Sequence, residues 1–202
     1  MPIHLNPCRT VGFAACLAMF VFSGALRAND VDLEKIEVRE VRTPVYDAES
    51  APKARARYDW LQIMIEYDAD GGGDEWIDRV AFEYRVRLRI PGPDIVLART
   101  VTYKDVPEGT QHAVVYVRPR FILRHNDGRS LGRNDVQVLV HAVVNGDSSG
   151  YMHYPEDRPS SRWWEDSDHR QVDNELYNRL ETPFAPVDWD YYQDIVTEEE
   201  GG

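Results

Sequence analysis

The chain has 202 residues, of which 43% are hydrophobic and 29% charged, and its formal net charge is −12. This length and apolar content are sufficient for one domain with its own core. The acidic balance argues against nucleic acid and anionic lipid as main partners, because both carry negative charge themselves.

Residues 1–25 have the pattern of an export signal. Arg9 supplies a positive charge, residues 11–22 form an apolar run, and residues 23–25 offer small side chains for signal peptidase. The apolar run is too short to span a bilayer. We therefore expect an exported protein of the periplasm or the cell surface, with no membrane span in the mature chain. An uncleaved anchor is the alternative.

Both cysteines, Cys8 and Cys16, lie inside the signal. The mature chain is therefore expected to contain no disulfide and no thiol chemistry, and its stability must come from a packed core. Cys16 follows Phe-Ala-Ala, which leaves lipidation of this cysteine as a second possibility for the N-terminus.

The strongest element lies at residues 78–90, where every second residue is apolar from Val80 onward. These residues are Val80, Phe82, Tyr84, Val86, Leu88 and Ile90. A period of two places one set of side chains on a core and the other in water. The pattern predicts a long strand of an antiparallel sheet that is buried on one face.

Further strands are predicted along the chain, and turn signals separate them. Their ranges are 31–41, 58–68, 95–106, 112–117, 136–144 and 150–154. In 136–144 the apolar set alternates with Gln137, Leu139, His141 and Val143. The glycine-rich stretch 68–75 and the dipeptide Asn145-Gly146 predict hairpins.

Little of the remaining sequence is helical. Short helices are predicted at 118–125 and 172–180, residues 182–192 read as an extended aromatic segment, and residues 196–202 as a disordered acidic tail. About seven short strands with so little helix indicate an all-β protein. We predict one immunoglobulin-like antiparallel β-sandwich domain over residues 26–195.

A serine motif follows the last predicted hairpin. Gly146-Asp-Ser-Ser-Gly150 matches the Gly-x-Ser-x-Gly pattern, which requires a strand, a sharp turn and a helix to present the serine to a base. The residues that follow are not helical, and no spacing identifies a histidine or an acid for Ser148. We interpret the stretch as a polar hairpin loop and expect no enzyme activity. A hydrolase that uses Ser148 is the alternative.

The acidic turn at 68–75 offers oxygen ligands for calcium from Asp68, Asp70, Asp74 and Glu75. It does not fit an EF-hand loop that begins at Asp68, because the twelfth position is Arg79. None of the six histidines is paired at the spacing of a helical metal site. We therefore predict a plain hairpin turn, no metal site and no cofactor.

Two groups of side chains are candidates for binding. Arg85, Arg87 and Arg89 share the outward face of the central strand, where they could bind an anionic ligand or pair with acids on neighbouring strands. Trp163 and Trp164 could stack on sugar rings, as in a carbohydrate-binding module, or pin the C-terminal stretch to the sandwich. Because acidic residues dominate the C-terminal third, we expect that third to pack near these arginines.

Several short stretches together resemble one protein family. They are 58–63, 76–80, Tyr84, 101–103, Trp163, Trp164, 182–185, Trp189, Asp190 and Tyr192. In this order they are similar to the small exported, pilus-like proteins of verrucomicrobial bacteria, which are encoded beside type IV pilus assembly genes. The closing aromatic stretch is the most specific part, and the resemblance spans most of the mature chain.

The resemblance implies an immunoglobulin-like sandwich, no enzyme activity and a structural or accessory role in pilus biology. Its implied partners are pilus or cell-envelope proteins. The chain departs from ordinary pilins in lacking a prepilin-type leader with a long apolar helix. We therefore expect an envelope-associated adaptor that acts through protein contacts rather than a polymerising pilin, with the carbohydrate-binding module as the alternative.

Overall fold

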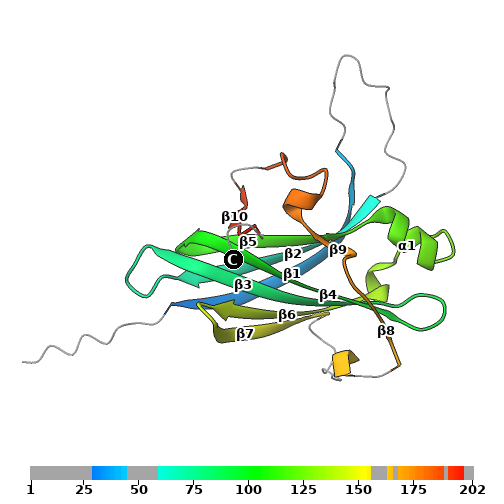
Figure 1. Cartoon of the computed structure of the whole chain (residues 1–202), viewed down its shortest axis with the longest axis horizontal. Helices are drawn as coiled ribbons and strands as arrows, with labels where there is room; N and C mark the ends of the chain where they lie inside the picture. Colours follow the sequence, from blue (N-terminus) through cyan, green and yellow to red (C-terminus); the bar gives the residue numbers. More distant parts are fainter. Residues whose placement is uncertain (1–28, 45–58, 156–162, 166–167, 189–190, 198–202) are drawn as a thin grey trace, which may run out of the picture.

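The computed structural model describes residues 29–44, 59–155, 163–165, 168–188 and 191–197. Long strands dominate this part of the chain and form two layers (Figure 1). They are β1 (Asp30–Arg42), β2 (Asp59–Asp70), β3 (Trp76–Leu88), β4 (Ile95–Pro107), β5 (Gly109–Val117), β6 (Val136–Val144) and β7 (Asp147–Tyr154). The predicted signal at 1–25, Trp189 and the end of the predicted tail lie outside the described residues.

The long strands form two antiparallel sheets that pack as a β-sandwich. One sheet contains β1, β2 and β5 in that order, and the other contains β4, β3, β6 and β7. All these neighbours are antiparallel. The chain changes sheets after β2, β4 and β5, so that β5 returns beside β2 and β6 beside β3, a Greek-key arrangement. The predicted all-β sandwich is confirmed.

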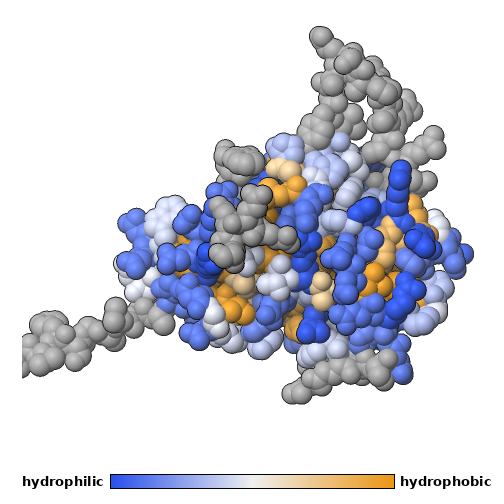
Figure 2. Space-filling model, in the orientation of Figure 1, coloured by the Kyte–Doolittle hydropathy of each residue, from blue (hydrophilic) through white to orange (hydrophobic). Residues whose placement is uncertain are grey.

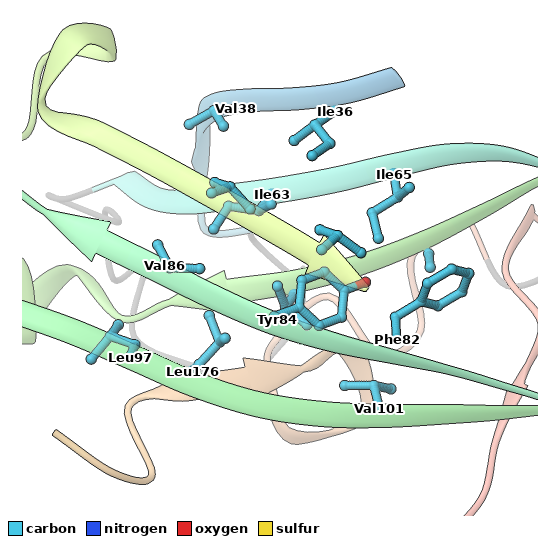
Figure 3. Close-up of a cluster of buried hydrophobic side chains, with 14 of the residues drawn as sticks. Ile36, Val38, Ile63, Ile65, Phe82, Tyr84, Val86, Leu97, Val101 and Leu176 are labelled. Atoms are coloured by element: carbon cyan, nitrogen blue, oxygen red, sulfur yellow. The ribbon is translucent and has the colours of Figure 1, made fainter. Parts of the chain in front are cut away.

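The core lies between the two sheets, and the alternation in β3 builds its centre. Val80, Phe82, Tyr84, Val86 and Leu88 all point inward and are buried. Their partners come from both sheets, as Figure 3 shows for Ile63 and Ile65 of β2. On the face in Figure 2 hydrophilic side chains dominate, and hydrophobic ones reach the surface in separate patches.

Aromatic rings in the core also pack against one another. The ring of Phe82 packs against Tyr67 of the facing sheet at a centroid distance of 4.8 Å and against Tyr103 of β4 at 6.0 Å. Each such pair contributes about 0.5–1.5 kcal/mol beyond the area it buries. The predicted inward orientation of this strand face is therefore confirmed at its largest residues.

Three short strands come from the C-terminal segment, defined here as residues 168–197. They are β8 (Arg170–Val172), β9 (Leu176–Asn178) and β10 (Asp194–Ile195). β8 and β10 pair with opposite ends of β4, whereas β9 pairs with β5 of the other sheet. The segment thus passes from one sheet to the other and back. It covers the side of the sandwich where β4 and β5 form the edges, which we call the β4/β5 flank.

The predicted helix at 172–180 is wrong. The stretch forms the end of β8, then β9, and then the 3-10 turn η3 (Arg179–Glu181). The edge of β5 offers backbone hydrogen-bonding groups at Val115–Val117, and pairing with it outweighs the weak local preference for helix. Leu176 is buried in the main core as a result.

The remaining helical elements are short. They are α1 (Pro119–His125), η1 (Arg133–Asp135) and η2 (Trp163–Glu165). Pro119 begins α1, a position where its missing N–H costs no intrahelical bond. Within the described ranges, no helix combines the length and the apolar character needed to cross a membrane.

Candidate functional site

The outer face of the larger sheet carries the polar residues of β3 and β6 in register. Glu83 lies directly opposite His141, and Arg85 lies opposite Leu139. On the other side of β6, Tyr151 and His153 of β7 lie opposite the same two residues, His141 and Leu139. Three adjacent strands therefore bring these side chains to one patch of surface.

This patch contains two pairs of stacked aromatic rings. The Tyr151 ring stacks on the His141 ring at a centroid distance of 4.2 Å with 8° between the planes. The Trp164 ring stacks on His153 at 5.8 Å and 23°. Tyr151 is 63% exposed, so its face away from His141 is open to solvent.

A groove of about 550 Å³ lies between these pairs. It is lined by Glu83, Arg85, Leu139, His141, Tyr151, His153 and Trp164. The lining combines aromatic rings with one carboxylate and one guanidinium, which is the mixture found in many small-molecule sites. We call this feature the sheet groove.

The predicted binding residues separate into two groups. Arg85 and Trp164 both line the sheet groove. Trp163 is only 5% exposed and packs on Val96 and Leu139, so it fixes η2 to the sheet. This arrangement agrees with the pinning interpretation for Trp163 and leaves Trp164 available to a ligand.

Arg87 and Arg89 lie outside the groove lining. The Arg87 guanidinium is half-buried and forms an ion pair with Asp94 at 2.6 Å. The backbone N–H of Arg89 donates to the carbonyl of Asp135 at 2.8 Å. Among the described residues, by contrast, the Arg85 side chain forms no ion pair.

The acidic C-terminal third meets a different arginine from those we expected. Glu181 pairs with Arg99 of β4 at 2.8 Å, and the same guanidinium donates to the carbonyl of Leu176 at 2.9 Å. The partner of Arg87 is Asp94, which comes from the loop between β3 and β4. Among the described residues, charge pairing attaches the C-terminal segment at the β4/β5 flank.

Ser148 has hydrogen-bonded neighbours that the sequence did not reveal. Its Oγ lies 2.9 Å from Nε2 of His141, and Nδ1 of the same ring lies 3.0 Å from Oε2 of Glu83. A serine, a histidine and a carboxylate are therefore connected in line across β7, β6 and β3. His141 and Glu83 also line the sheet groove, so this chain of hydrogen bonds borders it.

The acidic turn between β2 and β3 has a simpler geometry. The backbone N–H of Gly72 donates to Oδ1 of Asp70 at 3.0 Å, and the N–H of Asp74 donates to the carbonyl of Gly71 at 3.2 Å. Among the described side chains, no three His, Cys, Asp or Glu residues gather in a way that would hold a metal ion.

Comparisons with known proteins identify relatives of the whole domain. A protein-family model matches residues 23–199. A crystal structure of a protein from Akkermansia muciniphila superimposes with a TM-score of 0.71 at 22% sequence identity, covering 84% of this chain and 94% of that protein. No curated protein matches. This similarity shows that the two proteins share a fold.

Proposed function

Because the chain belongs to the family whose model matches residues 23–199, we infer that it is an exported structural or adaptor protein of the cell envelope. We place it with type IV pilus assembly or at the cell surface, where it acts through protein contacts. Family membership over nearly the whole chain is the observation that carries this proposal. The pilus association rests on the order of short stretches described above.

Two edges of the sandwich carry no further strand within the described part of the chain, and they supply the mode of contact. β4 and β5 are covered by β8, β9 and β10, whereas β1 and β7 stand at the ends of their sheets. We call the side formed by these two strands the β1/β7 flank. An uncovered edge strand presents unpaired backbone groups to which a partner can add a strand. The solvent-facing residues of β1, such as Glu34, Lys35 and Glu40, are charged, which limits unspecific pairing.

Site-specific photocrosslinking in the native envelope tests this proposal. A photoreactive residue replaces Glu40 on the free strand β1, and in a matched variant it replaces Thr100, an exposed residue of the covered strand β4. We expect pilus secretin or alignment proteins to crosslink from position 40 and not from position 100. Absence of any pilus assembly protein from both positions contradicts the proposal.

The sheet groove favours carbohydrate binding as a second candidate function. Tyr151 and Trp164 offer ring faces on which sugar rings can stack, and Arg85 and Glu83 offer a hydrogen-bond donor and an acceptor for sugar hydroxyls. Trp163 does not contribute to carbohydrate binding, because its side chain is buried between η2 and the sheet.

Titration of the purified protein with soluble glycans tests this second candidate. Binding should quench tryptophan fluorescence, and Trp164→Ala and Arg85→Gln should each abolish retention on a glycan column. Arg89→Gln is the matched control, because Arg89 follows the end of β3 and lies outside the groove lining. Retention that survives both groove variants contradicts a role for this groove.

A further inference from the structure

We propose that Ser148 is an activated nucleophile that cleaves carboxylic esters, with His141 as its base and Glu83 as the group that orients the base. This activity goes beyond the contacts inferred above. It rests on the hydrogen-bonded chain across three strands and on the groove beside it.

The two ring nitrogens of His141 have distinct partners, which fixes their roles. Glu83 is a carboxylate that only accepts hydrogen bonds when ionised, so Nδ1 carries the hydrogen and donates to Oε2 at 3.0 Å. Nε2 is then the acceptor for the Ser148 hydroxyl at 2.9 Å. This is the tautomer in which a histidine removes the proton of an attacking serine.

The surrounding strands hold His141 in this orientation. Glu83 is its direct cross-strand neighbour on β3, and Tyr151 is its neighbour on β7, with the two rings stacked in parallel. The side chain of His141 is 17% exposed, whereas that of Glu83 is 54% exposed. The imidazole is thus confined from both sides within the sheet.

The hairpin turn brings Ser148 back to His141. Asn145 and Gly146 both have positive φ values, 51° and 96°, as a tight two-residue hairpin requires. Val144 and Asp147 close the turn, and the next pair is Val143 with Ser148. Ser148 is therefore the second residue of β7, one pair after the turn, on the strand adjacent to the histidine.

The same register leaves the backbone N–H of Ser148 without a partner on β6. In a two-residue hairpin the closing pair, Val144 and Asp147, is hydrogen-bonded, and hydrogen-bonded and non-hydrogen-bonded pairs alternate. The N–H of Ser148 consequently points away from β6. No described strand pairs with that side of β7, which ends its sheet. The N–H of the nucleophile itself is a usual donor to the oxyanion in acyl transfer.

The reaction balances with water as the only co-reactant. Oγ of Ser148 bonds to the ester carbonyl carbon while its proton passes to Nε2 of His141. The carbon–oxygen bond to the alcohol then breaks, and the alcohol leaves with that proton. Water adds to the acyl-serine with His141 again accepting a proton, and the carboxylic acid departs as the proton returns to Ser148.

The sheet groove indicates where the ester would lie. His141, Glu83 and Tyr151 belong both to the groove lining and to the surroundings of the nucleophile. Ser148 borders the groove beyond His141, so an ester would place its ring against Tyr151 in the groove and extend its carbonyl past the His141 ring toward Ser148. The substrate class is therefore a carboxylic ester of a sugar or another cyclic alcohol.

Labelling with a fluorophosphonate probe tests the nucleophile directly. The serine oxygen displaces fluoride from phosphorus, and peptide mass spectrometry locates the adduct. We expect the adduct on Ser148 in the folded mature chain, its loss in Ser148→Ala, and a decrease of about 100-fold or more in rate for His141→Gln, the usual scale of general-base catalysis. Glu83→Gln should lower the rate as well, because its amide can donate to Nδ1 and favour the wrong tautomer.

Ser149→Ala is the matched control, since Ser149 contacts Asp30 and Val31 rather than His141. It should label like the parent protein and should hydrolyse p-nitrophenyl acetate at the parent rate, whereas Ser148→Ala should not. Circular dichroism confirms that each variant is folded. An unlabelled Ser148, or a labelling rate that His141→Gln leaves unchanged, overturns the proposal. Neither result affects the crosslinking from position 40, so the two functions fail independently.

Discussion

The two flanks of the sandwich are closed in different ways. At the β4/β5 flank the C-terminal segment pairs with both edge strands, and the Tyr103 hydroxyl accepts a hydrogen bond from the Val114 N–H at 3.1 Å. At the β1/β7 flank the described link between the sheets is local, and it runs through Ser149 to the start of β1. The contrast teaches that the C-terminal segment covers one flank, whereas the other flank carries no added strand within the described residues.

Alkaline pH should destabilise the core, including the Tyr103 hydroxyl that links β4 to β5. Burial raises the pKa of Tyr67, Tyr84 and Tyr103 above the ordinary value of about 10, because the charged phenolate is disfavoured in the core. Stability is therefore complete below about pH 10 and falls as the pH rises above it, since the unfolded chain releases these protons first.

Three buried phenols give a slope of up to about 4 kcal/mol per pH unit. Denaturant unfolding at a series of alkaline pH values measures this slope, and tyrosinate absorbance should appear together with unfolding. Ionisation of all tyrosines near pH 10 without loss of the native circular dichroism spectrum would show that these hydroxyls are accessible.

Of the single substitutions proposed here, Phe184→Ala should lower the free energy of unfolding most. The Phe184 ring stacks on Tyr116 at 4.7 Å with 3° between the planes and meets Trp60 edge-on at 5.9 Å. Removing a buried ring costs about 3–5 kcal/mol, because it forfeits burial and leaves a cavity. Urea unfolding measures the loss. Trp76→Ala is the control, since Trp76 is 52% exposed and surface changes stay within about 0.5 kcal/mol.

The sequence pattern was sufficient to predict the sandwich but not to predict the arrangement of side chains at the candidate site. The alternation around Phe82 and the Asn145-Gly146 turn act locally, so they predicted β3 and the β6–β7 hairpin. The link from Glu83 to His141 joins residues far apart in sequence, and it depends on the pairing of β3 with β6, which no local signal fixes.

The C-terminal segment was predicted only in part. The stretch 182–192, which was predicted to be extended, instead forms consecutive turns over residues 182–188, and Phe184 is buried there. The helix predicted at 172–180 failed because its apolar spacing also suits a short strand at an open sheet edge. Trp163 and Trp164 are adjacent in sequence and equal in type, and only the path of η2 over the sheet separates the buried residue from the groove residue.

Two tyrosine-to-phenylalanine changes should affect the free energy of unfolding differently. Tyr103→Phe leaves the N–H of Val114 without its acceptor across the β4/β5 flank, which costs about 1–3 kcal/mol. The Tyr67 hydroxyl is buried with no hydrogen-bond partner among the described residues, so Tyr67→Phe should be neutral or stabilise by about 1 kcal/mol. Equal effects in chemical denaturation would contradict a specific role for the Tyr103 hydroxyl.

Ser149→Ala should lower the free energy of unfolding least, and it should act at the β1/β7 flank. The Ser149 Oγ accepts from the Val31 N–H at 2.9 Å, lies 3.1 Å from the Val31 carbonyl oxygen and bonds to Asp30. These groups are partly exposed, so water can replace the serine, and the expected loss is about 0.5–1.5 kcal/mol. Hydrogen exchange at the Val31 amide should accelerate while amides of β4 and β5 keep their protection. If Ser149→Ala costs as much as Phe184→Ala, the β1/β7 flank is held as firmly as the covered one, and an added partner strand would have to displace that link first.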